Sequence, residues 1–286
     1  MDQSQARKRF RKILERKEVI YPASVYDPIS ARIAFALGFE AGIMGGSLAS
    51  ASVLAAPDLI VLTLTELADH VNRTTRAADI SLIVDADHGY GNALNVMRTV
   101  QELESAGASA LTIEDTALPK PFRQKKGGEL IGKDEMIAKL KAAVEAKRDP
   151  DLVVIGRSSA LQHCPEQAIE RIEAYAGAGV DALMLMGATS YEQIAAIHHA
   201  TELPLIIGYV TPKTDDLKKL ADCGVRIALR GHFSFYVAVQ SLYDSIKHLK
   251  DGGSPEELKG KMATEEVMNM VFRTKDYKDW QEKYLN

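Results

Sequence analysis

The sequence lacks long hydrophobic runs and has few cysteines, and both absences narrow the class of protein. No apolar run approaches the ~20 residues that a membrane-spanning helix needs. The first residues are polar and lack the hydrophobic stretch of a secretory signal peptide. The only cysteines, Cys164 and Cys223, lack metal-binding spacing and are expected to be reduced thiols in a core or a loop. We therefore expect a cytoplasmic protein without membrane contact.

The sequence also lacks an excess of positive charge and any low-complexity tract. A formal net charge of −4 and an isoelectric point near 6.0 offer no general basic surface for nucleic acid. The 286-residue length suits one α/β barrel, and no linker rich in Pro, Gly or Ser divides the chain. We expect a single domain over residues 1–286, with a small molecule as its partner.

Short apolar runs recur along the chain, each followed by a segment with helical character. The runs are Val19–Ala23, Ala41–Met44, Leu82–Val84, Ala110–Ile113, Leu152–Ile155, Ala182–Met186, Leu205–Ile207 and Arg226–Leu229. Such continuous hydrophobicity is typical of parallel strands buried on both faces. Repeated units of this kind predict an α/β fold, a (β/α)8 barrel of the TIM type. An open, doubly wound sheet is the alternative.

The C-terminal segment, about residues 235–286, has helical patterns instead of a further strand. The patterns cover residues 235–249, 255–262, 264–271 and 276–285, and the last carries Tyr277, Trp280 and Tyr284. Aromatic residues on a terminal helix more often pack on a core or on a neighbouring subunit than bind a cofactor. We expect a helical extension packed in one of these two ways.

The most informative motif is Asp85-Ala86-Asp87-His88-Gly89-Tyr90-Gly91, directly after the run Leu82–Val84. Residues i and i+2 of a strand face the same side, so Asp85 and Asp87 are expected to point together. Placing two ionised carboxylates side by side costs free energy unless a cation or a proton lies between them. Oxygen ligands favour Mg²⁺ or Mn²⁺ over Zn²⁺. A solvated turn is the alternative. His88 would orient a metal ligand or face solvent.

Other chemically active side chains follow the remaining runs at the same end. These groups are Gly45-Gly46-Ser47, Glu114-Asp115, Gly156-Arg157-Ser158, Gly208-Tyr209 and Arg230-Gly231-His232. Barrel enzymes place catalytic groups at the carboxyl ends of their strands. The sequence therefore predicts one pocket in which a site for a hard metal faces a site for an anion.

Several of these residues also have structural interpretations. Glu114 or Asp115 could cap the next segment, and Arg157 could pair with Glu114 instead of binding an anion. On residue type alone, an ordinary loop histidine is the better interpretation of His232. Ser47 has no nearby histidine to activate it as a nucleophile, and its glycines suit a backbone amide nest for a carboxylate.

Taken in order, these strings resemble the isocitrate lyase/phosphoenolpyruvate mutase superfamily over roughly residues 10–245. The strings are Ala23–Asp27, Gly45–Ser47, Asp85–Gly91, Ile113–Asp115 and Gly156–Arg157. The resemblance implies a (β/α)8 barrel, Mg²⁺ as the cofactor (with Mn²⁺ as the other possibility), and an α-keto or α-hydroxy carboxylate substrate. It also implies a homotetramer whose subunits exchange a C-terminal helix.

The resemblance also implies residue roles. Asp85 would bind the metal directly, and Asp87 and Glu114 would bind it through water. The substrate-binding residues would be Ser47, Gly46, Arg157, His232, Tyr209 and Tyr26, and Asp58 matches a position near the pocket.

The chain departs from the superfamily's lyases in one loop. Those lyases carry a catalytic Cys in a mobile loop, where this chain has Pro119–Gln124 with Phe122 at the Cys position. The stretch Gln124–Gly128 is expected to be basic and mobile. Together with Asn92–Val100 and Arg230–His232, this loop most resembles the oxaloacetate decarboxylase branch.

The resulting hypothesis is Mg²⁺-dependent decarboxylation of oxaloacetate to pyruvate and CO₂ through a metal-stabilised enolate. Asp85, Arg157 and His232 would be the catalytic residues, with His232 positioning the departing carboxylate and relaying a proton. Three alternatives remain. They are a C–C lyase acting on a 2-methylisocitrate- or dimethylmalate-like acid, a phosphonopyruvate-processing enzyme, and a catalytically degraded dicarboxylate-binding protein.

Overall fold

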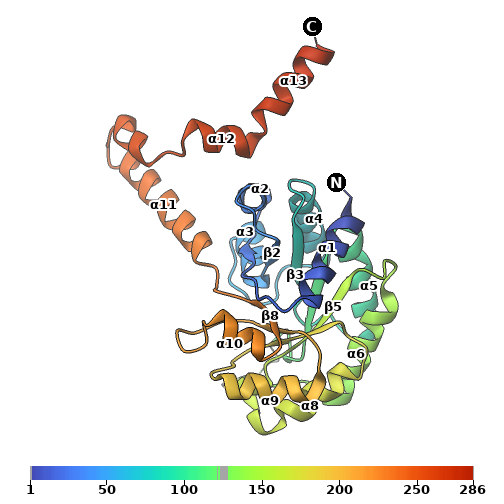
Figure 1. Cartoon of the computed structure of the whole chain (residues 1–286). Coiled ribbons are helices and arrows are strands. Elements are labelled where there is room, and N and C mark those ends of the chain that lie inside the picture. Colours follow the sequence, from blue (N-terminus) through green and yellow to red (C-terminus); the bar gives the residue numbers. More distant parts are fainter. Residues whose placement is uncertain (1, 121, 123–127, 286) are drawn as a thin grey trace.

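Eight parallel strands form one sheet in chain order, β1 to β8, with helices between them (Figure 1). The computed structural model describes residues 2–120, 122 and 128–285. The strands are β1 (Ala23–Ser24), β2 (Ala41–Met44), β3 (Ser81–Asp85), β4 (Ala110–Glu114), β5 (Val153–Ser158), β6 (Ala182–Leu185), β7 (Leu205–Ile207) and β8 (Val225–Ala228). The predicted (β/α)8 architecture is confirmed.

The ring closes between the first and last strands, which excludes the open-sheet alternative. Ile20 and Ile227 form a parallel bridge. The Ile20 amide donates to the Arg226 carbonyl at 3.0 Å, and the Ala228 amide donates to the Ile20 carbonyl at 3.0 Å. The predicted first strand, Val19–Ala23, was wrong in extent. Pro22 has no amide hydrogen, so regular pairing is interrupted there and resumes at β1.

The first ten α-helices of the described chain pack on the barrel, α1 against one end and the others around it. They are α1 (Gln3–Glu15), α2 (Pro28–Ala36), α3 (Gly46–Leu54), α4 (Leu64–Thr75), α5 (Ala93–Ser105), α6 (Lys133–Ala146), α7 (Ala160–His163), α8 (Ala168–Ala176), α9 (Tyr191–Thr201) and α10 (Leu217–Asp222). Local sequence sets their limits. Asn92 caps α5 with its side chain, and Gly107 follows that helix at φ 98°, a conformation that glycine adopts without strain. Within the described residues, none of the helices combines the length and hydrophobicity needed to cross a bilayer.

Helix α1 closes the amino-terminal end of the barrel. Its buried residues Phe10, Ile13 and Leu14 pack with inward-facing strand residues such as Ile43 and Ile83. A second, larger apolar cluster lies between the strands and the surrounding helices. Because the interior is filled from this end, the polar site must lie at the carboxyl ends of the strands.

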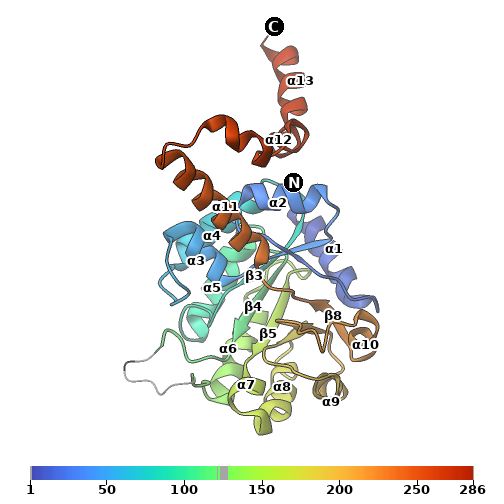
Figure 2. The same cartoon turned by 90° about the vertical axis from the view of Figure 1, so that its left-hand side faces the viewer.

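The C-terminal helices project away from the barrel in both views (Figures 1 and 2). They are α11 (Phe233–Lys250), α12 (Glu265–Phe272) and α13 (Thr274–Tyr284), with a 3₁₀ segment at Pro255–Lys261. Helix α12 contacts α2, and Val271 is buried there. Helices α11 and α13 have no buried residue. Of the two packing modes expected for the terminal aromatic helix, packing on its own barrel is therefore wrong.

Candidate active site

Three charged side chains meet at the carboxyl ends of β3, β4 and β5. Asp85 ends β3 and Glu114 ends β4, and Arg157 stands beside Glu114 in the register of β4 and β5. Arg157 Nη1 lies 2.7 Å from Asp85 Oδ2, and Arg157 Nε lies 3.0 Å from Glu114 Oε2. The convergence expected from the strand ends is confirmed for these residues. Arg157 pairs with both carboxylates, so the structural interpretation in which it pairs with Glu114 is confirmed.

Asp85 is the most heavily hydrogen-bonded member of the cluster. Its carboxylate accepts from Thr112 Oγ1 at 2.9 Å, the Asp87 amide at 3.2 Å and the Gly46 amide at 3.3 Å. Burial alone would raise the pKa of Asp85, but Arg157 and these donors bring it below its ordinary value. Asp85 is therefore ionised and held in one orientation.

The surroundings of Asp87 and Glu114 make ionisation of these two carboxyl groups unfavourable. Burial and the charges of Asp85, Asp58 and Glu114 raise the pKa of Asp87 to about 9. Burial raises the pKa of Glu114 to about 7, and the charge of Asp85 adds to that shift while Arg157 opposes it. Arg157 thus pairs with Asp85 and Glu114, while the nearby charges of Asp58 and Asp87 have no ion pair with it in the described residues. A divalent cation would relieve the repulsion among these carboxylates.

The oxygen atoms around Asp85 suit a cation that is bound directly by few protein side chains. In residues 2–120, 122 and 128–285, no three His, Cys, Asp or Glu side chains form a group that could hold a metal ion directly. The oxygen-rich, sulfur-free surroundings of Asp85 suit a hard ion such as Mg²⁺, which keeps several of its waters.

The turn after β3 holds Asp87 in a strained backbone conformation. Asp87 has φ 47° and Tyr90 has φ 61°, values that side chains other than glycine rarely adopt. Lys139, which is buried, donates to the His88 carbonyl at 3.0 Å and ties the turn to α6. His88 is 6% exposed, so the alternative in which it faces solvent is wrong.

Two glycines before α3 allow functional side chains to approach the backbone. A Cβ atom at Gly46 would lie 2.6 Å from Asp87 Oδ1, and one at Gly45 would lie 2.8 Å from His232 Nε2. Helix α3 begins at Gly46, and its first amide donates to Asp85. Ser47 is half-buried in the first turn of this helix, where unpaired amides favour an anion.

His232 follows β8 and occupies the N-cap position of α11, although its side chain makes no capping hydrogen bond within the described residues. Its Nδ1 lies 2.7 Å from Ser24 Oγ, and its Nε2 faces Gly45. Burial lowers the pKa of His232, and the charge of Asp85 opposes that effect. His232 therefore shares the mouth of the barrel with the carboxylate cluster.

The two predicted tyrosines lie at the edge of this region. Tyr26 lines a groove of about 390 Å³ between the segment after β1 and the start of α11, and its ring packs edge-on against Phe235 at 5.0 Å between centroids. Tyr209 follows β7, is 48% exposed, and its ring lies beside Gly231. Within the described structure, neither side chain is hydrogen-bonded to Asp85 or Arg157. Pro121 and residues 123–127, which include most of the predicted basic loop, lie outside the described residues.

Asp115, which the sequence placed in the pocket or at a helix cap, lies behind the cluster, and sequence reasoning missed its partners and the role of Thr112. Asp115 is fully buried and accepts from Ser158 Oγ at 2.7 Å, the Ser159 amide at 3.1 Å and Tyr175 Oη at 3.0 Å, so it does not cap a helix. Thr112 lies two residues before Glu114 on the same face of β4. That spacing was the available signal for its bond to Asp85.

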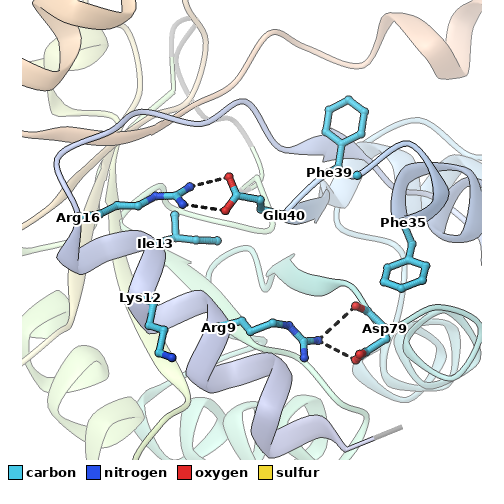
Figure 3. Close-up of a pocket in the computed structure, with 9 residues that line it drawn as sticks. Arg9, Lys12, Ile13, Arg16, Phe35, Phe39, Glu40 and Asp79 are labelled. Atoms are coloured by element: carbon cyan, nitrogen blue, oxygen red, sulfur yellow. Dashed lines mark hydrogen bonds and ion pairs between the residues drawn. The ribbon is translucent and has the colours of Figure 1, made fainter.

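A second charged pocket lies at the opposite end of the barrel (Figure 3). It has a volume of about 440 Å³ and is lined by residues of α1, α2 and the segments before β2 and β3. Arg16 pairs with Glu40 at 2.6 Å and Arg9 pairs with Asp79 at 2.7 Å. Its carboxylates thus have cationic partners one to one, unlike those around Asp85.

Comparison with known proteins places the chain in a family. The phosphoenolpyruvate phosphomutase family model matches residues 10–250. A protein of Paraburkholderia xenovorans (strain LB400) named oxaloacetate decarboxylase is 46% identical over 280 residues, covering 98% of this chain and 93% of that protein. A second protein of that name, from Rhodopseudomonas palustris (strain BisB18), is 49% identical over 268 residues, covering 93% of this chain and 92% of that protein.

The structure of a phosphonopyruvate hydrolase in complex with oxalate and Mg²⁺ has the same fold. It superposes with a TM-score of 0.84 at 27% sequence identity and covers 100% of both chains. From the matched family model, the near full-length relatives and the barrel itself, we conclude that the chain belongs to the phosphoenolpyruvate phosphomutase family.

Proposed function

We propose that the protein catalyses the Mg²⁺-dependent decarboxylation of oxaloacetate to pyruvate and CO₂. The observation that carries this proposal is the near full-length similarity to proteins named oxaloacetate decarboxylase. The buried acidic cluster with one arginine supports it, because an α-keto dicarboxylate needs both a cation and a guanidinium in its site.

The metal is proposed to be Mg²⁺, with Mn²⁺ as the alternative. Asp85 would bind it directly, since its carboxylate is ionised and oriented, and Asp87 and Glu114 would bind it through water. The raised pKa values of Asp87 and Glu114 support this assignment, because a bound cation stabilises their ionised forms. When bound, the metal would supply Lewis-acid stabilisation of the negative charge that develops as CO₂ leaves.

The substrate's carboxylate would bind between Arg157 and the start of α3. Arg157 offers a fixed positive charge, and the Ser47 amide and hydroxyl offer donors at the helix N-terminus that begins at Gly46, whose own amide donates to Asp85. Tyr26 and Tyr209 would contact the substrate from the edge of the site. Binding in a preorganised, buried site concentrates these electrostatic effects where charge develops.

His232 would position the carboxylate that leaves as CO₂. It would then transfer a proton to the carbon that loses the carboxylate, which converts enolpyruvate to pyruvate. Its place across Gly45 from α3 puts the imidazole on the same side of the site as the substrate-binding amides.

We also propose a homotetramer of single-domain subunits that exchange their C-terminal helices, in a cytoplasmic setting without nucleic acid or membrane partners. Helix α11 supports the exchange. Its Tyr236, Val237, Leu242, Tyr243 and Ile246 are each about 60% exposed in the isolated chain. A contiguous apolar face of this kind marks a protein interface, and a second copy of the chain is the proposed occupant.

The proposal is tested by measuring pyruvate formation from oxaloacetate with added Mg²⁺, with EDTA, and in a protein-free blank containing the metal. Saturable turnover well above the blank, lost in EDTA, is expected. The same assay with 2-methylisocitrate, 2,3-dimethylmalate and phosphonopyruvate serves as the specificity control. Turnover of one of these acids with oxaloacetate at the blank rate would contradict the proposal.

A further inference from the structure

We propose that Ser24 is a positioning residue that fixes the tautomer of His232, so that the imidazole gains and loses its proton at Nε2. The catalytic consequence rests on the proposed function, whereas the tautomer itself is a property of the resting protein. Ser24 is the last residue of β1, and His232 follows β8, the strand that closes the ring beside it.

The Ser24 hydroxyl has two neighbours that compete for one hydrogen. Ser24 Oγ lies 3.1 Å from the Gly231 carbonyl oxygen and 2.7 Å from His232 Nδ1. A carbonyl oxygen can only accept, so it must receive the hydroxyl hydrogen if this contact is a hydrogen bond. The hydroxyl oxygen is then left as an acceptor, and His232 must donate from Nδ1.

The opposite tautomer leaves one of these contacts without a hydrogen. If the Ser24 hydroxyl donated to Nδ1, no hydrogen would remain for the Gly231 carbonyl. The Nδ1–H tautomer satisfies both contacts, and a buried polar group left without a partner costs about 1–3 kcal/mol. The neutral ring therefore carries its hydrogen on Nδ1 and its lone pair on Nε2.

The Nε2 atom faces the barrel mouth. It lies 2.8 Å from the position that a Cβ atom would occupy at Gly45, immediately before the first residue of α3. Within the described residues Nε2 has no protein hydrogen-bond partner, in contrast to Nδ1. The ring thus presents its free nitrogen to the site and its bonded nitrogen to β1.

A further contact keeps the loop after β8 in register with β1. The Arg230 guanidinium stacks on the Tyr21 ring at 3.5 Å from the centroid, and the Tyr21 hydroxyl donates to Asp215 at 2.6 Å. Arg230 also pairs with Asp215 at 3.1 Å. These contacts flank Gly231 and Ser24, so the carbonyl that determines the hydroxyl orientation is itself held in place.

This arrangement gives a simple proton cycle for the proposed reaction. In the imidazolium, Nδ1–H donates to Ser24 and Nε2–H faces the substrate. The Nε2–H bond breaks as the electron pair of the enolate forms the new C–H bond of pyruvate. The neutral ring keeps its Nδ1–H bond to Ser24 and takes the next proton from water at Nε2. The ring therefore need not turn between cycles.

The direct test is the ¹⁵N NMR spectrum of the histidine-labelled full-length protein at a pH where the ring is neutral, with His232→Gln identifying the resonances. The wild type is expected to show a protonated Nδ1 and an unprotonated Nε2 for His232. Ser24→Thr, which keeps a hydroxyl, should preserve this pattern, and Ser24→Ala should shift the population toward Nε2–H. A wild-type ring protonated on Nε2, or an unchanged tautomer in Ser24→Ala, would overturn the inference.

The kinetic test separates positioning from general loss of structure. Ser24→Ala is expected to lower kcat for pyruvate formation by roughly ten- to a hundredfold with KM changed little, and Ser24→Thr should restore most of it. Ser81→Ala is the matched control, because Ser81 also lies on a barrel strand and donates to a carbonyl, that of Ala6 at 2.7 Å, at the opposite end. Full kcat in Ser24→Ala, or an equal loss in Ser81→Ala, counts against the inference. Wild-type protein without oxaloacetate turnover would refute the proposed function instead, while the NMR result still decides the tautomer.

Discussion

At the scale of single residues, Asp85 is the carboxylate of the site whose charge and orientation are held by the most contacts. One guanidinium and three hydrogen-bond donors meet at its carboxylate, whereas Asp87 and Glu114 are pushed toward protonation by burial and like charge. In the proposed function Asp85 is ionised before the metal binds, and the bound cation would stabilise the ionised forms of Asp87 and Glu114. The sequence predicted the residue types from their spacing. The different charge states depend on the contacts that Arg157 and Thr112 make with Asp85 from neighbouring strands, and neither contact was predicted from the sequence.

The absence of a side chain at Gly46 is expected to be essential for activity. In Gly46→Ala the new Cβ would lie 2.6 Å from Asp87 Oδ1, so the carboxylate must move. We expect kcat/KM for pyruvate formation to fall by roughly a hundredfold, with the thermal unfolding midpoint little changed. Gly132→Ala is the control, because a Cβ there meets nothing within 4 Å. Near wild-type kinetics in Gly46→Ala would show that Asp87 has no fixed role.

At the scale of elements, the strands were predictable because each is an almost uninterrupted apolar run. The residues that follow each run could therefore be assigned to the same end of the barrel from the sequence alone. The exception is the first strand, where Pro22 interrupts pairing inside a run that looked continuous. The buried network of Asp115, Ser158 and Tyr175 was also unpredictable, because it joins β4, β5 and α8 through polar residues with no local pattern.

Helix α1 is expected to support stability without taking part in chemistry. Phe10 is fully buried at the amino-terminal end of the barrel. Phe10→Ala should lower the free energy of unfolding by about 3–5 kcal/mol, as measured by urea denaturation. The kcat of the folded variant at low temperature should remain within about twofold of the wild type. Lys12→Ala, at an exposed position of the same helix, is the control, and a large loss of kcat in folded Phe10→Ala would show that the two ends are coupled.

The ion pair that anchors α1 is expected to make stability depend on acid pH. Burial raises the pKa of Asp149, but the hydrogen bond from Arg7 at 2.8 Å, with the Asp151 amide, brings it below its ordinary value. A carboxyl with a lowered folded-state pKa stabilises the fold above its unfolded pKa, about 4, and loses this contribution as pH falls through the lower folded value.

Asp149→Asn should therefore cost about 1–3 kcal/mol of unfolding free energy near neutral pH. The difference from the wild type should shrink below about pH 4. Urea denaturation at a series of pH values measures it, and Asp69→Asn, in an exposed pair on α4, is the control. A difference that stays constant down to strongly acidic pH would contradict the account.

At the scale of the whole molecule, the two ends of the barrel differ in charge balance. At the amino-terminal end arginines and carboxylates pair one to one (Figure 3), and at the carboxyl end Arg157 alone pairs with two carboxylates, Asp85 and Glu114, within the described residues. The sequence predicted that the carboxyl end would hold the site. It did not predict that α12 would contact α2 while α11 and α13, in the described structure, would bury no residue, since a helical pattern does not specify the surface against which it packs.

The projecting α11 is expected to be buried in the assembled protein. Leu242→Asp should convert the oligomer to smaller species in size-exclusion chromatography with light scattering, because a charge would enter an apolar interface. Leu94→Asp is the matched control, since Leu94 is 75% exposed on α5, outside the C-terminal extension. A monomeric wild-type protein, or an unchanged oligomer in Leu242→Asp, would contradict helix exchange.

The most direct test of the central claim compares oxaloacetate turnover by the wild type, Asp85→Asn and Asp79→Asn in the presence of Mg²⁺. Asp85 is the last residue of β3 and Asp79 lies just before its first, and among the described residues Asp79 pairs with Arg9 alone. The account predicts that Asp85→Asn loses at least roughly a hundredfold in kcat/KM, equivalent to about 2.7 kcal/mol, while Asp79→Asn stays close to the wild type. Full turnover by folded Asp85→Asn would contradict the account.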